Sequence, residues 1–229
     1  MKILAIGAHP DDIEIFMFGL LCCFKQKGNE ISMIVATDGS LGGNNLKNKL
    51  VINRKTETKK GLKKLGIPLF LNIKDGSLGN EAKHTKIIKS CILKVKPDII
   101  ITHFYKDYHS DHINLSRIVK TIAGHYIPVL YCDTMMGVNF LPNYYVDVTK
   151  YINDKFNSIS YHKTQKPERF IALVKLMNSY RSAQCNSPKG HYAEAYYFEP
   201  SFPFSDIRKY LPESPKILPF HIENINGFL

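Results

Sequence analysis

The sequence contains no tryptophan and five cysteines among its 229 residues, and the cysteines show no C-x-x-C spacing. An odd number of scattered cysteines argues against a disulfide framework and against a cysteine-based zinc knuckle. We therefore expect a reduced, cytoplasmic protein. No apolar run approaches the roughly 20 residues of a membrane-spanning helix, and the N-terminal MKILAIGA is predicted to be a strand rather than a signal segment.

Acidic residues are fewer than basic ones, 20 against 31, which gives a formal net charge of +11. Clustered lysines pair with phosphates, so this balance raises the question of nucleic-acid binding. The densest group, in residues 47–64, lies on an amphipathic helical pattern, which is typical of a solvated face. Because no zinc-finger or RNP-type motif accompanies it, nucleic acid is disfavoured as a partner. A preference for anionic substrates or membrane surfaces stays open.

Apolar runs and helical patterns alternate through the first half of the chain. The predicted strands are 2–8, 31–37, 69–73 and 98–102, and the predicted helices are 13–27, 46–65, 81–95 and 112–123. Such alternation with short connections indicates right-handed βαβ units. The expected fold class is α/β, a Rossmann-like open, mainly parallel sheet flanked by helices, and the length fits a single domain.

The second half continues with more irregular elements. We predict strands at 129–131, 144–148 and 195–198 and helices at 151–163 and 168–183. The expected domain covers 1–200. The proline-rich residues 201–229 show little periodicity and are predicted to be a C-terminal extension that packs on the domain or on a partner. A homo-oligomer remains open.

Two polar clusters follow predicted strands. AHPDDIE, residues 8–14, follows the first strand, and YKDYHSDH, residues 105–112, follows the strand at 98–102. In parallel sheets ligands bind at the carboxyl ends of strands. His9 and Asp12 stand three residues apart, which suits a chelate, and one histidine of the pair His109 and His112 would complete a His/Asp/His set. That set, with an open position for water, is typical of catalytic zinc sites.

The neighbouring side chains suggest how such a site would work. Asp11 beside the ligand pair could take a proton from the attacking water and hand it to a leaving amine. His109, if it is not a ligand, could stabilise an oxyanion, with Asp111 fixing its tautomer.

Simpler interpretations exist for each of these residues alone. Asp11 or Asp12 could cap the next helix, and the two histidines of HSDH could lie on the surface. The coincidence of both clusters at strand ends favours a metal site. Glu14 stays open, either as an acceptor for a ligating histidine or as an exposed residue, and His103 is predicted to be a packed strand-end residue.

Together, AHPDDIE and HSDH resemble the hallmarks of the zinc-dependent de-N-acetylases of the PIG-L/LmbE family, an AHPDDxE motif and an HxDH motif about a hundred residues later. The resemblance covers about residues 2–200. Further segments resemble family landmarks in their expected order: Thr37-Asp38-Gly39, Arg54 with Glu57, Asp147-Val148-Thr149, His162 with Gln165, and GHYAEA at 190–195. Within the family, the chain looks similar to small bacterial enzymes that act on N-acetylglucosaminyl-malate in bacillithiol synthesis.

The resemblance assigns roles to individual positions. It implies zinc ligands at His9, Asp12 and His112, a general base and acid at Asp11, and an oxyanion partner at His109. It also implies a substrate contact for Arg54, whose guanidinium can bind hydroxyls or a phosphate in bidentate fashion. For Glu194 it implies either a substrate contact or a role in orienting the site. A surface ion pair of Arg54 with Glu57 or Glu81 is the alternative.

The sequence thus predicts a zinc-dependent hydrolase that removes the N-acetyl group from an N-acetylglucosamine-type glycoside or sugar conjugate, a small-molecule substrate. Fe(II) also suits a His/Asp/His set. The alternative is a non-catalytic metal-containing module whose basic surface binds an anionic partner.

Overall fold

The computed structural model describes residues 1–43 and 47–219. In these residues the chain forms a seven-stranded sheet of order β3-β2-β1-β4-β5-β7-β6. Neighbouring strands among β1 to β5 run parallel, whereas β7 is antiparallel to both β5 and β6. The strands are β1 Lys2–Gly7, β2 Glu30–Thr37, β3 Leu69–Ile73, β4 Ile99–Thr102, β5 Val129–Cys132, β6 Tyr144–Asp147 and β7 Ala193–Phe198. The predicted open, mainly parallel sheet is confirmed.

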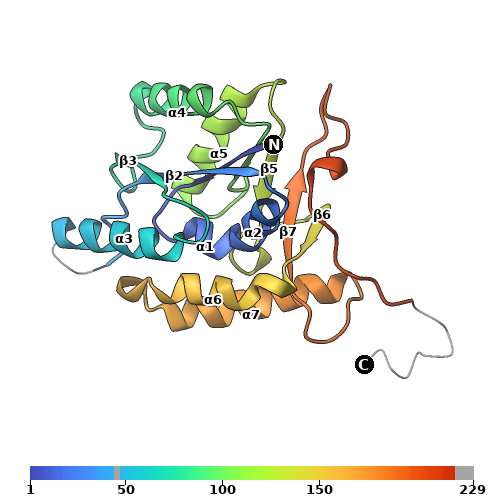
Figure 1. The fold of residues 1–229 in the computed structure, drawn as a ribbon. Helices are drawn as coiled ribbons and strands as arrows, with labels where there is room; N and C mark the ends of the chain where they lie inside the picture. Colours follow the sequence, from blue (N-terminus) through green and yellow to red (C-terminus); the bar gives the residue numbers. More distant parts are fainter. Residues whose placement is uncertain (44–46, 220–229) are drawn as a thin grey trace.

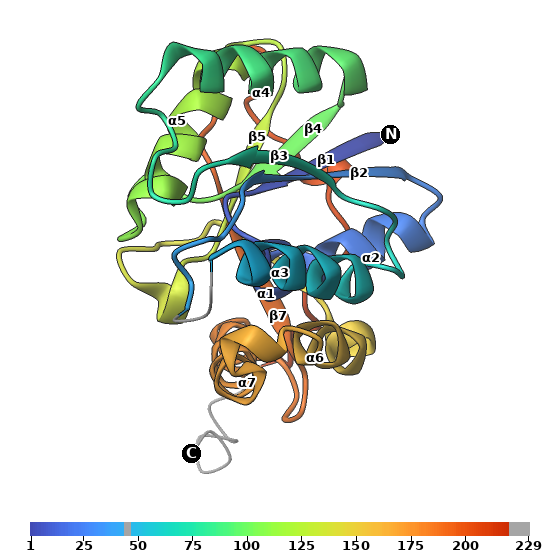
Figure 2. The same cartoon turned by 90° about the vertical axis from the view of Figure 1, so that its left-hand side faces the viewer.

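Helices cover both faces of this sheet (Figure 1). On one face lie α4 and α5, and on the other lie α1, α2 and α3, with α6 and α7 forming a further layer beneath them (Figure 2). The helices are α1 Asp12–Phe16, α2 Phe18–Gln26, α3 Lys47–Gly61, α4 Ala82–Val95, α5 Ser110–Ala123, α6 Ile152–Ser160 and α7 Pro167–Gln184. Among the described residues, the helices are all too short or too polar to span a bilayer.

The central strand β1 shows why this layered arrangement follows from the sequence. Its side chains alternate between two cores, with Ile3 and Ala5 packed in one and Leu4 and Ile6 in the other. All four are fully buried. A strand covered by helices on both faces needs apolar residues at every position, which explains the continuous apolar run.

The helix predicted at 13–27 is two helices, because the chain breaks at Met17, where φ is −130°. The carboxylate of Glu194 on β7 accepts hydrogen bonds from the backbone N–H groups of Gly19 and Leu20, each at 2.8 Å. The unpaired N–H groups in the first turn of α2 thus find their acceptor in a side chain that is 174 or more residues away in the sequence. Helical periodicity in the local sequence cannot reveal such a partner. The predicted start of the next helix, residue 46, lies outside the described residues.

The described part of the C-terminal extension, 201–219, lies against the outer strand β6. Asp147 N donates to Glu213 O at 3.0 Å, and Leu218 N donates to Asn186 O at 2.9 Å. Ile207 is buried against the core. These contacts cover part of the exposed backbone of an edge strand, which is otherwise a site of unwanted pairing.

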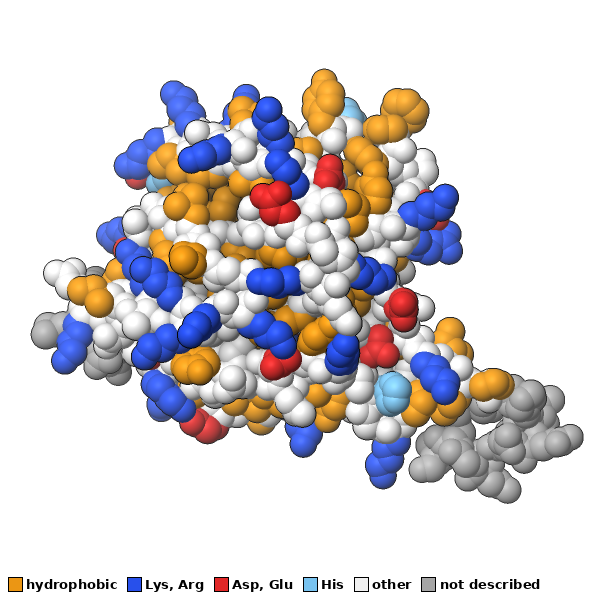
Figure 3. Space-filling model, in the orientation of Figure 1, with side chains coloured by type: hydrophobic (Ala, Val, Ile, Leu, Met, Phe, Trp, Pro, Cys, Tyr) orange, Lys and Arg blue, Asp and Glu red, His pale blue; other side chains and the backbone are white. Residues whose placement is uncertain are grey.

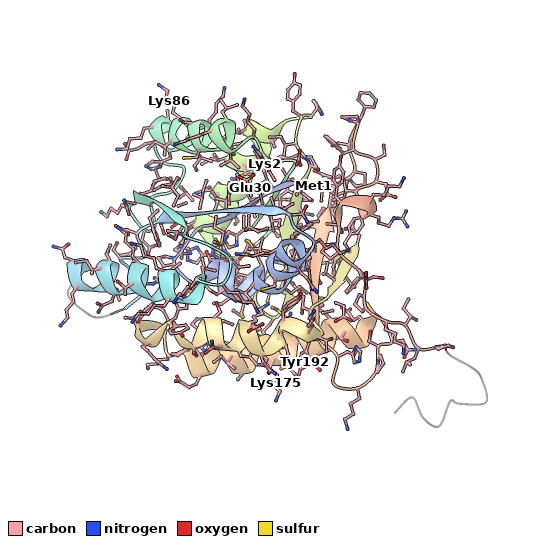
Figure 4. All side chains as sticks on the ribbon, viewed as in Figure 1. Met1, Lys2, Glu30, Lys86, Lys175 and Tyr192 are labelled. Atoms are coloured by element: carbon pink, nitrogen blue, oxygen red, sulfur yellow. The ribbon has the colours of Figure 1, made fainter. Side chains whose placement is uncertain are left out.

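Basic side chains are scattered over many elements on the face drawn in Figure 3. Lys86 on α4 and Lys175 on α7 point away from the sheet on opposite sides of the molecule, whereas Met1, Lys2 and Glu30 mark the ends where β1 and β2 begin (Figure 4). The positive charge is therefore spread over several outer surfaces.

Candidate active site

A pocket of about 440 Å³ lies at the carboxyl ends of the central strands. The loop after β1 supplies His9, Asp11 and Asp12, and the N-terminus of α5 supplies His109 and His112. Further lining residues come from α3, from the loops after β2 and β3, and from α7: Arg54, Leu41, Gly42, Asp75, Gly76 and Phe170. The structure thus brings together the two clusters that follow predicted strands in the sequence, because these strands, β1 and β4, are neighbours in the sheet.

Three candidate ligand atoms converge in this pocket. His9 Nδ1 lies 3.2 Å from His112 Nε2 and 3.4 Å from Asp12 Oδ2, and His112 Nε2 lies 3.5 Å from Asp12 Oδ2. Ligand atoms about 2.1 Å from a tetrahedral metal ion are separated by about 3.4 Å. The side chains therefore fit one ion such as Zn²⁺ without rearrangement.

Carboxylates behind the two histidines orient their rings. His9 Nε2 lies 3.3 Å from Asp111 Oδ2 and 3.3 Å from Asp75 Oδ1. His112 Nδ1 lies 2.9 Å from Asp107 Oδ2. A carboxylate that accepts the proton of one ring nitrogen directs the other nitrogen toward a metal and makes it a better donor.

His103, at the end of β4, contributes more than the packing expected from the sequence. It is fully buried, its ring stacks on His112 with a centroid distance of 3.7 Å, and its Nε2 lies 3.0 Å from Asp12 Oδ2. Ligand-atom geometry also groups His103 with Asp12 and His112, and His109 with His9 and His112. Several donors therefore surround the same point.

The charges of the pocket shift the pKa values of its histidines. Burial lowers the pKa of His9, but hydrogen bonds to Asp111, Asp12 and Asp75 outweigh it and raise the pKa to about 12. Burial likewise lowers the pKa of His112, but Asp12 and Asp107 raise it to about 9. A pocket that stabilises imidazolium so strongly also favours a divalent cation in place of the protons.

Asp11 has an unusual backbone conformation. Its φ of 132° and ψ of −22° lie outside the regions that L-residues normally adopt, and its side chain makes no helix-cap hydrogen bond. Such a conformation costs of the order of 1–3 kcal/mol and is typical of functional sites. Burial raises the pKa of Asp11 by more than Arg54 lowers it, and a raised pKa suits a group that must accept and return a proton.

Arg54 lies in the pocket but is held by the protein itself. Its Nη2 donates to Pro10 O at 2.7 Å and to Asp11 Oδ2 at 3.1 Å, and its Nη1 donates to Gly39 O at 2.9 Å. Only 3% of its surface is exposed. The surface pair with Glu57 or Glu81 is therefore wrong as an interpretation, because the partner of Arg54 is Asp11.

His109 is the N-cap residue of α5, and its Nδ1 accepts a hydrogen bond from the backbone N–H of Asp111 at 3.3 Å. An accepting Nδ1 places the proton on Nε2. Burial and the positive charges of His112 and His9 lower the pKa of His109, which favours the neutral ring. His109 therefore offers a neutral Nε2–H donor.

The expected role of the Asp111 carboxylate needs correction. Its backbone N–H, and not its carboxylate, fixes the tautomer of His109. The carboxylate instead contacts His9 and accepts backbone hydrogen bonds from Gly76 at 2.8 Å and Leu78 at 3.2 Å. Asp111 therefore supports a candidate ligand and ties the loop after β3 to it.

Glu194 also lies elsewhere than expected. It is buried at 2% exposure, is not among the lining residues of the pocket, and binds Lys155 Nζ at 2.7 Å and Tyr196 OH at 2.7 Å in addition to the first turn of α2. A substrate contact is therefore wrong for Glu194.

Glu14, whose role the sequence left open, is fully buried, and its Oε1 lies 2.9 Å from His162 Nε2. Glu14 is therefore neither exposed nor bonded to a candidate ligand.

Sequence reasoning missed two carboxylates that orient the candidate ligands. Asp75 follows β3 directly, so the rule that sites form at strand carboxyl ends could have found it. Asp107 lies inside the quoted cluster YKDYHSDH, five residues before His112. Its role depends on the loop that turns its side chain back onto the ring, which the sequence does not show.

The doubly covered, mainly parallel sheet defines an α/β protein, and its His/Asp pocket is a candidate metal site. A family model described as GlcNAc-PI de-N-acetylase (PIG-L) matches residues 4–123. An uncharacterized deacetylase of Escherichia coli K12, YaiS, is 30% identical over 173 residues, which are 71% of this chain and 90% of YaiS. The chain belongs to the PIG-L family of de-N-acetylases.

A second relative agrees with this assignment, and two solved structures share the fold. The diacetylchitobiose deacetylase of Thermococcus kodakarensis is 25% identical over 189 residues, 73% of this chain and 71% of that protein. The N,N'-diacetylchitobiose deacetylase of Pyrococcus horikoshii has a similar structure, with a TM-score of 0.75, 21% identity, and coverage of 89% and 87%. The 4-carboxy-2-hydroxymuconate hydratase GalB of Pseudomonas putida KT2440 has a TM-score of 0.78, 17% identity, and coverage of 90% and 99%. The last two show the fold alone.

Proposed function

We propose that the protein is a metal-dependent hydrolase that removes the N-acetyl group from an N-acetylglucosamine-type glycoside or sugar conjugate. The observation that carries this proposal is the convergence of His9 Nδ1, Asp12 Oδ2 and His112 Nε2, with Asp11 in the same pocket. Membership of a de-N-acetylase family supports the reaction type. The substrates named for the diacetylchitobiose deacetylases support an acetylated sugar.

His9, Asp12 and His112 would hold the ion, which we propose to be Zn²⁺, with Fe²⁺ as the second candidate because the same donor set suits both. A divalent ion there supplies a Lewis acid for the amide carbonyl and lowers the pKa of water. Asp75, Asp107 and Asp111 keep the two imidazoles oriented through the nitrogens that face away from the site.

Asp11 moves the proton in this reaction. Its carboxylate accepts a proton from the water that attacks the acetyl carbonyl, and it returns that proton to the amine nitrogen as the C–N bond breaks. One water and one amide become acetic acid and a free amine, which at neutral pH are present as acetate and the protonated amine, and the Asp11 carboxylate is regenerated. Its raised pKa matches both halves of this role, since a weakly basic carboxylate would accept the proton poorly.

His109 stabilises the developing oxyanion. The neutral ring donates through Nε2 while Nδ1 is held by the backbone N–H of Asp111. A donor that is oriented before the reaction loses little free energy to reorganisation when charge develops on the oxygen.

The test is acetate release by the metal-reconstituted protein from a panel of N-acetylglucosamine conjugates, including the malate glycoside, diacetylchitobiose and a nucleotide-linked sugar. Asp11→Asn should keep the metal and lose about 10²–10⁴-fold in turnover, the usual contribution of a general base. Near wild-type turnover by Asp11→Asn would contradict the role of Asp11.

A non-catalytic metal-containing module with a basic surface is the second candidate, because the net charge is +11. Stoichiometric metal with no acetate release from any conjugate, together with tight binding of an anionic polymer, would favour this candidate. The presence of Asp11 and His109 around the candidate metal site favours the hydrolase instead.

A further inference from the structure

The strained backbone at Asp11 is fixed by one hydrogen bond on each side of the Asp11 Cα atom. On the carboxyl side, Asp11 O accepts a hydrogen bond from Ile15 N at 3.0 Å, the first hydrogen bond of α1. On the amino side, Pro10 O, the carbonyl oxygen of the Pro10–Asp11 peptide, accepts a hydrogen bond from Arg54 Nη2 at 2.7 Å. The same nitrogen donates to Asp11 Oδ2 at 3.1 Å.

This arrangement fixes the torsion that is unusual. The φ angle of Asp11 describes rotation between the Pro10–Asp11 peptide plane and the rest of Asp11, and Arg54 Nη2 binds one atom on each side of that bond. Both hydrogens of Nη2 are thus used within the protein. Without these two hydrogen bonds, rotation of Asp11 to an ordinary φ would relieve the backbone strain and would turn its carboxylate out of the observed position.

We propose that Arg54 is a positioning residue that acts through Asp11, by holding the Asp11 carboxylate in the strained conformation in which it faces the reacting centre. This inference rests on the proposed hydrolase function. It replaces the substrate contact expected for Arg54 from the sequence, because the Nη2 hydrogens and one Nη1 hydrogen are already bonded to Pro10, Asp11 and Gly39.

The loop after β2 is shaped to admit the guanidinium. A Cβ atom at Gly39 would lie 2.7 Å from Arg54 Nη1, and a Cβ atom at Gly42 would overlap the same nitrogen. At Gly43, by contrast, the neighbours that a Cβ atom would meet among the described residues are Leu50 side-chain carbons at 3.6 and 3.7 Å, an ordinary contact. The absence of a side chain at Gly39 and Gly42 therefore lets the loop pack closely against Arg54. Alanine substitutions at Gly42 and Gly43 form a matched pair, since only the first would displace the guanidinium.

Steady-state kinetics separate positioning from substrate binding. Arg54→Met should lower kcat by about 10²-fold, the cost of a misplacement of about 1 Å at a reacting group, while KM and zinc affinity change little. Arg54→Lys, which keeps the charge but not the paired donors, should recover little of the loss. A rise in KM with unchanged kcat would indicate a substrate contact and overturn the proposal.

A double-mutant cycle tests whether the effect passes through Asp11. In the Asp11→Asn background, Arg54→Met should cause almost no further loss, because the carboxylate that it positions is gone. Multiplicative losses would contradict the proposal. Gly42→Ala should reproduce the loss of kcat although Arg54 is intact, whereas Gly43→Ala should behave like wild type; equal activity of the two alanine variants would also overturn it.

A readout without turnover keeps this inference separate from the proposed function. In a crystal structure of zinc-loaded Arg54→Met, Asp11 should leave φ near 132°, and in Gly42→Ala the Nη2 bonds should lengthen or break. If Asp11 keeps its conformation in Arg54→Met, the inference fails whatever the reaction is. If wild-type protein with bound zinc releases no acetate from any conjugate, the proposed function fails, and the conformation of Asp11 still decides the role of Arg54.

Discussion

Among the buried clusters of charged residues in the described part of the chain, the one around Glu194 and the one in the pocket are built in opposite ways. Around Glu194, every charged atom meets a complementary partner: two backbone N–H groups, Lys155 Nζ and Tyr196 OH all lie 2.7–2.8 Å from its carboxylate. In the pocket, two histidine nitrogens face each other at 3.2 Å, and three histidines crowd one oxygen of Asp12. The first cluster is complete within the protein, whereas the second converges on a point that a cation fits.

This difference explains why residue types alone are ambiguous. Glu194 and Asp12 are both buried carboxylates in family-like motifs, and both contact basic side chains. Only the direction in which the donors point distinguishes a structural network from a ligand site. A satisfied network rigidifies the fold, while converging donors raise the affinity for a ligand that replaces their protons.

The largest effect is expected from His112→Ala. Removal of one of three candidate ligands should weaken zinc binding by more than about 10²-fold, beyond the 10–100-fold loss caused by an outer partner, and should abolish acetate release. Zinc content after dialysis and circular dichroism of the metal-free variant would check this. Full zinc occupancy in a folded His112→Ala protein would remove His112 from the ligand set.

The Glu194 cluster should respond in stability instead. Glu194→Gln leaves Lys155, which is 0% exposed, without a counter-charge, and breaking a buried pair in this way costs about 3–5 kcal/mol. Urea unfolding would measure the loss, and zinc affinity of the folded fraction should stay near wild type. Glu199→Gln, which breaks the half-exposed pair with Lys120, is the matched control and should cost less than about 1 kcal/mol.

The sequence was sufficient for the parts of the site that depend on strand ends. The apolar run before AHPDD and the order of βα units predict that both polar clusters lie at the carboxyl edge of a parallel sheet. His9 and His112 meet there because β1 and β4 are neighbours in the structure. Contacts that depend on the conformation of a loop could not be predicted from the sequence. The carboxylate of Asp107 illustrates this limit, since it reaches His112 through a loop, whereas Asp75, just after β3, could have been found by the strand-end rule.

The error at Glu194 has a different physical origin. The last three residues of its motif, GHYAEA, begin β7, which inserts between β5 and β6 and runs antiparallel to both. The expected substrate contact came from the family resemblance, whereas in the structure the Glu194 side chain binds Lys155 and the first turn of α2, partners that are distant in the sequence. The break between α1 and α2 was hidden for the same reason, because Glu194 is its distant partner.

A smaller effect is expected from the partners of the candidate ligands. Asp107→Asn should lower zinc affinity by about 10–100-fold, because the neutral amide accepts the His112 Nδ1 proton less strongly than a carboxylate does. Competition with a chelator of known affinity would measure the change. Asp98→Asn, at the opposite end of the sheet, where Asp98 accepts a hydrogen bond from Lys2 N, should leave zinc affinity unchanged. Unchanged zinc affinity in Asp107→Asn would mean that the His112 ring does not need a carboxylate at Nδ1 to bind the ion.

The smallest effect is a difference in pH dependence between the metal-free and the zinc-loaded protein. The pKa of His112 is raised from 6.5 to about 9 in the folded metal-free protein, so its stabilising contribution is complete below pH 6.5 and is lost as the pH rises through 9. His112 alone should therefore lower the unfolding free energy by about 1.4 kcal/mol per pH unit between these values.

Zinc should reverse the sign of this dependence. Since the ion must displace the protons of His9 and His112, its affinity rises as the pH rises toward 9, and the stabilisation that it provides rises with it. Thermal unfolding midpoints between pH 6.5 and 8.5, measured with and without a fixed excess of zinc, should thus diverge. Parallel curves would show that zinc and protons do not compete for these two histidines, and the pocket would then be a satisfied network like the one around Glu194.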